Sequence, residues 1–195
     1  MRRSLGVWRK KVAATARQLA AWGLVSGSSG NVSRRVDKLV FITPSGIPYE
    51  FLHPQQVVVM ELDSPLISPG NYGPEAPSSE WRLHFSIYRA REDVRAIVHT
   101  HSPYATAASL RGRLSVLHDE GKLLFGDELP VSAHAPRGTW ALAQAVTQAL
   151  GRGKAALIAR HGAVTVGYTL REALLYALKL EELAQVAFLA RSDSA

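Results

Sequence analysis

Short apolar runs that alternate with amphipathic helical segments restrict the fold of this chain more than any other feature of its sequence. Runs that contain β-branched residues between turn-forming residues predict strands. They lie at 39–42, 57–62, 96–100, 155–159 and 164–166. Apolar residues three and four apart, or helix-start signals, predict helices. These lie at 5–19, from 81 onward, from 103 onward, at 140–150 and at 169–191. The pattern predicts an α/β fold, with a turn-rich connection at 26–31.

Length and composition exclude several other classes of protein. A chain of 195 residues predicts one domain over 1–195, since domains average roughly 150 residues. The absence of cysteine excludes a disulfide scaffold, a thiolate zinc site and a cysteine nucleophile. No apolar run approaches the ~18–20 residues of a membrane span. No apolar signal core follows the basic start of the chain, so we expect a cytoplasmic protein with no membrane partner.

The net charge of +7 raises the question of an anionic partner. The basic residues form only short clusters, and no aromatic-interleaved basic stretch accompanies them. We therefore expect no nucleic-acid partner. A solvated basic surface is the favoured interpretation, and steering of a phosphorylated substrate is the alternative.

Two histidines stand at the end of a predicted strand, in the string Val98-His99-Thr100-His101-Ser102. Side chains of a strand alternate between its faces, so His99 and His101 point the same way. Neutral imidazoles are good zinc ligands, although such pairs also occur as surface or hydrogen-bonded histidines. His161-Gly162 follows another predicted strand, and the glycine allows close backbone approach. Three histidines would leave an open position, as in a catalytic zinc site.

Glu80 begins a predicted helix after a proline-rich stretch at 64–79. A carboxylate gains there from the helix dipole, so ordinary first-turn charge is one interpretation. Beside a metal the same group could be a fourth ligand, a proton-transferring base, or each in turn. Among the other histidines, His118 alone offers an alternative, because Asp119 and Glu120 follow it.

Small hydrogen-bonding residues gather in three turns, whose backbone N–H groups and hydroxyls are free to face an anion. The turns comprise Gly30 with Asn31, Thr43 with Ser45 and Gly46, and Ser78 with Ser79. Each alone is only a turn. Together with three candidate metal ligands, they predict a phosphate-binding site.

The chain resembles the class II (zinc-dependent) sugar-phosphate aldolase and epimerase family, whose members act on compounds such as L-fuculose 1-phosphate. The resemblance covers nearly the whole chain, to the end of the last predicted helix. The matching motifs, in the family's order, are Ser29-Gly30-Asn31-Val32-Ser33, Thr43-Pro44-Ser45-Gly46, Ser78-Ser79-Glu80, His99-Thr100-His101-Ser102 and Arg160-His161-Gly162.

This resemblance implies a three-layer α/β/α fold around a largely antiparallel sheet, and a homotetramer with its sites near subunit interfaces. It implies one Zn²⁺ per subunit, and Glu80 as a ligand in the resting site that is displaced by substrate and then acts as the acid/base. The implied metal ligands are Glu80, His99, His101 and His161. The implied phosphate-binding residues are Asn31, Thr43, Gly46, Ser78 and Ser79.

The activity that the resemblance implies is cleavage of a phosphorylated ketose to dihydroxyacetone phosphate and a short aldehyde. The metal stabilises the negative charge of an enediolate, which agrees with the residue types. Epimerisation at C4 of a pentose phosphate and dehydration of methylthioribulose phosphate are alternatives on the same site. A non-catalytic sugar-phosphate binder is a further alternative, although binding alone needs no base such as Glu80.

The sequence also departs from the family. The fuculose-phosphate aldolases and ribulose-phosphate epimerases add a tyrosine from a neighbouring subunit or a C-terminal tail. No tyrosine occurs between Ala105 and Gly167, and His118-Asp119-Glu120 stands in the comparable stretch. The chain ends at Ala195, so we also expect no tail tyrosine. The group that protonates the aldehyde-side oxygen stays unassigned.

Overall fold

A computed structural model describes residues 2–63 and 75–192 of the chain. Within these residues the main sheet has six strands, and every neighbouring pair is antiparallel. Their order across the sheet is β3 (Val58–Glu61), β2 (Leu39–Ile42), β1 (Asn31–Val36), β4 (Ala96–Thr100), β8 (Gly162–Gly167) and β7 (Ala155–Ile158). The predicted strands at 39–42 and 96–100 are confirmed residue for residue.

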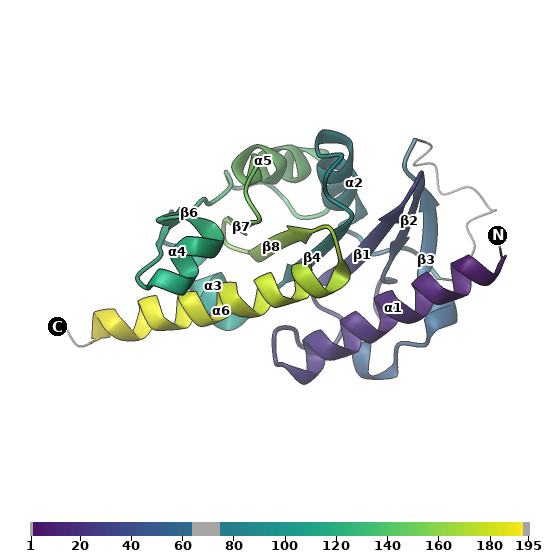
Figure 1. The fold of residues 1–195 in the computed structure, drawn as a ribbon, viewed down its shortest axis with the longest axis horizontal. Helices are drawn as coiled ribbons and strands as arrows, with labels where there is room; N and C mark the ends of the chain where they lie inside the picture. Colours follow the sequence, from purple (N-terminus) through teal and green to yellow (C-terminus); the bar gives the residue numbers. More distant parts are fainter. Residues whose placement is uncertain (1, 64–74, 193–195) are drawn as a thin grey trace.

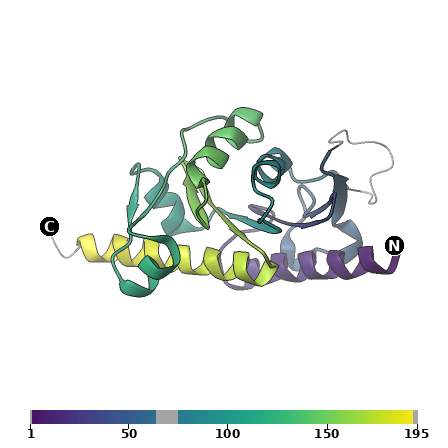
Figure 2. The same ribbon diagram turned by 45° about the horizontal axis from the view of Figure 1, so that its top comes forward.

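Helices cover both faces of this sheet, so the expected three-layer α/β/α fold is confirmed (Figure 1). One face carries α2 (Trp81–Ala90) and α5 (Trp140–Leu150). The other face carries α1 (Arg2–Ala21) and α6 (Leu170–Ser192). Figure 2 shows the start of α1 and the end of α6 at opposite ends of the molecule.

Smaller elements complete the fold. The short helix α3 (Pro103–Ser109) packs against α6 and β8. Two 3₁₀ turns, η1 (Tyr49–Phe51) and η2 (Pro54–Gln56), pack against α1. The strands β5 (Leu114–Ser115) and β6 (Glu128–Leu129) form a separate two-stranded sheet, and α4 (Asp119–Phe125) lies between them in the sequence. None of the helices within the described ranges has the length and apolarity to cross a bilayer.

The alternation of side chains along the strands divides the core into two apolar layers. Ile97 of β4 packs with residues of α2 and α5, whereas its neighbours Ala96 and Val98 pack with α1 and α6. Phe85 of α2 is fully buried in the first layer. Burial of a side chain of this size contributes about 1.5–3 kcal/mol, so both apolar layers stabilise the sheet.

The strand β1 was not expected, because the sequence predicts only a turn at 26–31 followed by polar residues. Ser33 and Arg35 are polar but buried, so this strand does not show the alternation of apolar and polar residues that predicts a strand. The guanidinium of Arg35 donates to the backbone carbonyl of Tyr88 at 2.8 Å, which satisfies a charge that would otherwise exclude this position from a core. The elements α4, β5 and β6 were also not predicted, and residues 64–74 of the proline-rich stretch lie outside the described ranges.

The motif residues lie together at one end of the central strands, hereafter the rim of the sheet. Asn31, at the start of β1, pairs with His99 near the end of β4, and Thr100 pairs with Ala163 at the start of β8. The end of β2 lies beside the start of β1, because Thr43 N donates to Val32 O at 3.0 Å. Antiparallel pairing therefore brings segments far apart in the sequence to a single rim.

Candidate metal centre

Four side chains meet at this rim: Glu80, His99, His101 and His161, hereafter the histidine–glutamate cluster. Each offers one ligand atom, and these atoms all lie within 4.8 Å of one another. Glu80 Oε2 is 2.9 Å from His99 Nε2, and Glu80 Oε1 is 3.4 Å from His161 Nε2. The Nε2 atoms of His99 and His101 are 2.9 Å apart. The structure thus brings His161 to the His-x-His pair.

The turn between β7 and β8 places His161. Arg160 has a φ of 61° and Gly162 a φ of 154°, so the chain reverses sharply on either side of the histidine. A Cβ atom on Gly162 would lie 2.0 Å from the carbonyl oxygen of Thr100. Only glycine permits this approach of the turn to β4, which sets the distance between His161 and the pair.

His101 is held through the turn that follows β4. Glu181 of α6 accepts hydrogen bonds from Ser102 Oγ at 2.6 Å, from Tyr104 N at 2.9 Å and from Ala105 N at 2.8 Å. Ser102 is the N-cap residue of α3 and Pro103 its first residue, as predicted. The carboxylate of Glu181 therefore supplies the acceptor for the orphan N–H groups of α3, directly after His101.

Hydrogen bonding and burial favour a cation at the centre of the cluster. The backbone carbonyl of Ala163 lies 2.8 Å from His99 Nδ1, so Nδ1–H donates there and Nε2 faces the cluster. Glu80 Oε1 and His161 Nε2 are buried without a hydrogen-bond partner. Buried polar atoms normally have partners. These two unsatisfied lone pairs, aimed at shared space, suit a divalent ion.

The ionisation states fit the same conclusion. Burial raises the pKa of Glu80, but His99, His161 and His101 together lower it to about 2. Burial, reinforced by His99, lowers the pKa of His101 to about 3 and that of His161 to about 4. Burial also lowers the pKa of His99, but the Glu80 carboxylate outweighs it and the net pKa is raised. At neutral pH the cluster offers a carboxylate and, at His101 and His161, neutral imidazoles, which are donors that zinc prefers.

A cavity of about 520 Å³ opens beside the cluster. Among the predicted phosphate-binding residues, the following line it: Gly30, Asn31, Ser45, Gly46, Ser78 and Ser79. Thr43 does not, and is fully buried. Its carbonyl accepts from Ser78 N at 3.0 Å and its hydroxyl accepts from Val32 N at 3.2 Å. Through these hydrogen bonds Thr43, buried behind the cavity wall, connects the turns that line the cavity.

A second buried polar group lies behind the cavity and was not singled out from the sequence. It comprises Asn31, Ser33, His84 and Tyr88, hereafter the His84 chain. His84 Nε2 contacts Asn31 Oδ1, Ser33 Oγ lies 2.6 Å from His84 Nδ1, and Tyr88 Oη lies 2.7 Å from Ser33 Oγ. Burial, with a smaller effect of His99, lowers the pKa of His84 to about 3, so its imidazole is neutral.

A neutral imidazole fixes the direction of every hydrogen bond in the His84 chain. Because the amide oxygen of Asn31 only accepts, His84 Nε2–H donates to it and Nδ1 accepts from the Ser33 hydroxyl. Ser33 in turn accepts from Tyr88 Oη–H. The amide nitrogen of Asn31 is thereby turned toward the cavity, where it donates to Ser78 Oγ at 3.0 Å and approaches Glu80 Oε2 at 3.5 Å.

The cavity has one more wall that the sequence did not indicate, formed by Arg137 and Gly138. Gly138 has a φ of 74° and its Cβ would lie 3.1 Å from Ser79 O. Its carbonyl accepts from Arg82 Nη1 at 3.0 Å. These contacts bring the segment before α5 against the start of α2. No sequence pattern near Arg137 and Gly138 connects this segment to the histidines.

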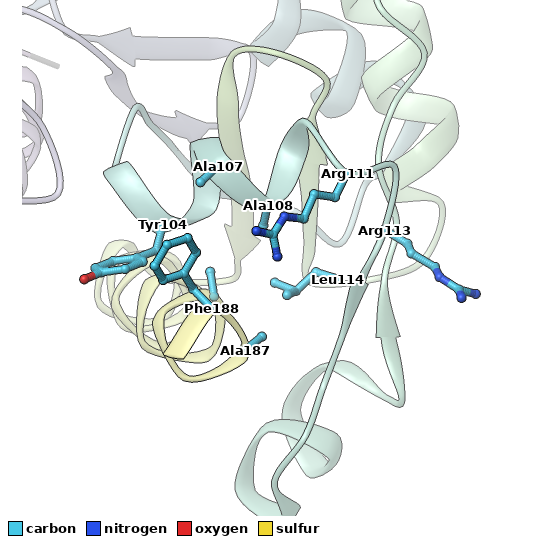
Figure 3. A pocket seen from close by; sticks show the side chains of 9 residues that line it. Tyr104, Ala107, Ala108, Arg111, Arg113, Leu114, Ala187 and Phe188 are labelled. Carbon is cyan, nitrogen blue, oxygen red and sulfur yellow. The ribbon is translucent and has the colours of Figure 1, made fainter. Parts of the chain in front are cut away.

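The remaining candidates lie elsewhere. His118 is the N-cap residue of α4, where its Nδ1 accepts from Gly121 N at 3.3 Å, and Glu120 pairs with Lys179 at 3.2 Å. This alternative therefore does not join the cluster. Figure 3 shows another hollow, where the ring of Tyr104 lies beside that of Phe188, with centroids 5.7 Å apart. Its lining is mostly apolar and holds no group of metal-ligating side chains among the described residues.

Comparison with known proteins gives a consistent result. The sequence model of the family "Class II Aldolase and Adducin N-terminal domain" matches residues 10–188. The 5-methylthioribulose-1-phosphate/5-deoxyribulose-1-phosphate aldolase of Rhodospirillum rubrum is 38% identical over 172 residues, which cover 87% of this chain and 75% of that protein. The L-fuculose phosphate aldolase of Escherichia coli K12 is 35% identical over 181 residues, which cover 91% and 80%.

Solved structures agree at the level of the fold. A structure of an L-fuculose 1-phosphate aldolase superposes with a TM-score of 0.89 at 28% identity, over 96% of this chain and 88% of that one. The L-fuculose-1-phosphate aldolase of Thermus thermophilus superposes with a TM-score of 0.83 at 32% identity, over 94% and 93%.

Proposed function

The chain belongs to the class II aldolase and adducin family, whose matched relatives include several aldolases, and on that premise we propose that it is a metal-dependent aldolase of phosphorylated ketoses. The products are dihydroxyacetone phosphate and a short aldehyde. The observation that carries the proposal is the histidine–glutamate cluster, with two unsatisfied buried atoms, at the wall of a cavity lined by neutral hydrogen-bond donors.

The metal that we propose is one Zn²⁺ per subunit. Its ligands are Glu80, His99, His101 and His161, because three imidazoles and one carboxylate suit zinc better than magnesium. A divalent ion held there would supply a Lewis acid that stabilises the negative charge developing on substrate oxygens, worth several kcal/mol.

The phosphate of the substrate is assigned to the three turns. Backbone N–H groups and hydroxyls bind phosphate without a large cation. The residues are Gly30, Asn31, Ser45, Gly46, Ser78 and Ser79 at the cavity, with Thr43 supporting them from beneath. The amide nitrogen of Asn31, fixed by His84, provides a side-chain donor whose direction is set before the ligand arrives.

Glu80 is proposed to move the proton. Its pKa of about 2 makes the carboxylate an acceptor at neutral pH, and its Oε1 has no hydrogen-bond partner. As the C3–C4 bond of the ketose 1-phosphate breaks, the proton of the C4 hydroxyl passes to Glu80. The carboxylate then returns it to C3, which completes dihydroxyacetone phosphate. The same atoms and protons are present before and after.

Glu80→Gln tests this role. The amide keeps the shape of the side chain but cannot accept the proton, so kcat is expected to fall about 10²–10⁴-fold, the range of general acid–base catalysis. Triose phosphate released from a panel of phosphorylated ketoses measures the effect, together with the metal content of the purified protein. Full turnover by Glu80→Gln would contradict the role. A retained carbon skeleton with lost water, or an inverted carbinol, would instead indicate a dehydratase or an epimerase.

The assembly and location of the protein are also proposals. We propose one domain over 1–195, a cytoplasmic location and a homotetramer with sites near its interfaces. Exposed apolar side chains directly after α3 and on α6 support an interface: Leu110 is 65% and Phe188 44% exposed. Light scattering after size-exclusion chromatography tests the tetramer, and a monomer at micromolar concentration would contradict it.

A further inference from the structure

Arg137 is the one residue with a permanent positive charge among those that the structure describes around the cavity. Its side chain is exposed to solvent. No carboxylate pairs with it within the described part of the chain. A guanidinium with five donors and no carboxylate partner among the described residues, in a cavity whose other walls are neutral turns and the histidine–glutamate cluster, is available to a ligand.

Arg137 lies on a segment that is anchored to β7, and its neighbour Gly138 contacts Ser79 of the third turn. Residue Ser132, five positions earlier, is tied to β7 because its N–H donates to Leu157 O at 2.9 Å. The same cavity is lined by His101 and His161, which follow β4 and β7. The turns at Gly30 and Thr43 belong to β1 and β2, on the other side of the cluster. The cavity thus has neutral walls at Gly30 and Ser45, and a cationic wall at Arg137 beside Ser79.

We propose that Arg137 binds a second anionic group, carried by the aldehyde half of the substrate. The preferred substrate is then a ketose 1-phosphate with a carboxylate or a second phosphate at its far end. Arginine recognises both groups by paired hydrogen bonds. This inference rests on the proposed function, since it assigns the half of the substrate that the phosphate turns leave free.

The inference distinguishes this chain from relatives with an uncharged end. One relative is named for 5-methylthioribulose 1-phosphate and 5-deoxyribulose 1-phosphate, whose carbon 5 bears a methylthio group or only hydrogen. A guanidinium gains no charge-assisted hydrogen bond from such a group. Arg137 therefore predicts a different substrate class for the same chemistry.

The test runs the reaction in the direction of addition, with dihydroxyacetone phosphate held constant. Two pairs of aldehydes differ only in the distal group: glycolaldehyde with glycolaldehyde phosphate, and butanal with succinic semialdehyde. The wild-type protein is expected to prefer the anionic member of at least one pair by about 10- to 100-fold in kcat/KM, the effect of hydrogen bonds to a charged group. The pair that shows the preference identifies the anion as phosphate or carboxylate.

Arg137→Gln is expected to reduce that preference at least tenfold, and Arg137→Lys to restore part of it. Arg152→Gln is the matched control, because Arg152 is 89% exposed and does not line the cavity. Equal rates within both pairs for the wild type would overturn the proposal. An equal loss on all aldehydes in Arg137→Gln would also overturn it, and would assign Arg137 to the phosphate of dihydroxyacetone phosphate. Failure of the proposed function is distinct, because no aldehyde would then react.

Discussion

The His84 chain and the histidine–glutamate cluster are neighbouring buried polar groups, and they differ in how completely they satisfy themselves. In the first, both nitrogens of His84 have partners and the hydroxyl of Ser33 bonds on both sides. In the second, Glu80 Oε1 and His161 Nε2 have none. Each group contains a fully buried histidine, His84 in one and His99 in the other. The presence of a buried imidazole therefore does not separate a structural group from a binding one.

The difference indicates that Glu80 Oε1 and His161 Nε2, two unsatisfied atoms that belong to one group of metal-ligating side chains, are placed to bind a ligand. An unsatisfied buried polar atom costs about 1–3 kcal/mol. A chain can keep such atoms where an external partner completes them. The His84 chain needs nothing from outside, and its product is the fixed amide of Asn31. The two groups meet where that amide approaches Glu80 Oε2.

Removing a member of the cluster should have the largest effect. His99→Ala is expected to lose the metal and to slow cleavage roughly a thousandfold, since Lewis-acid stabilisation is worth several kcal/mol. Metal content and triose phosphate release measure both effects. Chelation of the wild-type metal should reproduce the loss, and added Zn²⁺ should reverse it only in the wild type. Unchanged metal content and cleavage in His99→Ala would contradict the view that the histidine–glutamate cluster binds a metal and the His84 chain does not.

Removing His84 should give a different and smaller result. His84→Leu leaves Asn31 Oδ1 without its donor, which costs about 1–3 kcal/mol in unfolding free energy, and leaves the Ser33 hydroxyl bonded only to Tyr88. KM for the phosphorylated substrate should rise more than kcat falls, because Asn31 loses its orientation while the metal stays.

His84→Gln is the matched control, because its amide can again donate to Asn31 Oδ1. A KM in His84→Gln close to that of the wild type would support the assignment of His84 as a positioning residue. Loss of metal in His84→Leu would contradict it, because His84 would then support the cluster directly.

The pH dependence of stability offers a further test of the His84 chain. The pKa of His84 is about 3 in the folded protein against 6.5 for the free side chain, mainly because of burial. Between these values the unfolded chain binds the extra proton, so unfolding free energy falls as the pH is lowered from 6.5 toward 3. The slope for one proton approaches about 1.4 kcal/mol per pH unit. Urea unfolding of the wild type and His84→Gln should differ by this slope, and parallel curves would contradict it.

The smallest effect is expected at the far end of the His84 chain. Tyr88→Phe removes the hydroxyl that donates to Ser33, so unfolding free energy should fall by about 0.5–1.5 kcal/mol. Cleavage should change little, because Ser33 can still donate to His84. A loss of activity comparable to that of His84→Leu would show that the direction of the whole chain depends on Tyr88.

Local patterns allowed much of this architecture to be predicted. His99 and His101 share a strand face by simple alternation, and the capping box of Thr169 and Glu172 begins α6, with Glu172 N donating to Thr169 Oγ1 at 3.1 Å. The strand β1 was missed because its buried Arg35 is satisfied only by carbonyls distant in the sequence. Energetic compensation from another segment leaves no local signal.

The same reasoning separates the site residues. Glu80 and His84 are four positions apart, a spacing that places both on one side of a helix, so His84 could have been connected to Glu80. Arg137 could not, because its place depends on the contact of Gly138 with Ser79 and on the anchoring of Ser132 to β7. Such placement follows from tertiary packing alone.

Gly162 has a consequence for enzyme engineering. Since a side chain there would collide with the Thr100 carbonyl, mutant libraries that randomise this turn would consist mostly of misassembled catalysts. Arg137 has an exposed side chain and lines the cavity, so other side chains can be accommodated at this position. Directed evolution toward new aldehyde acceptors should therefore begin at 137 and leave 162 untouched.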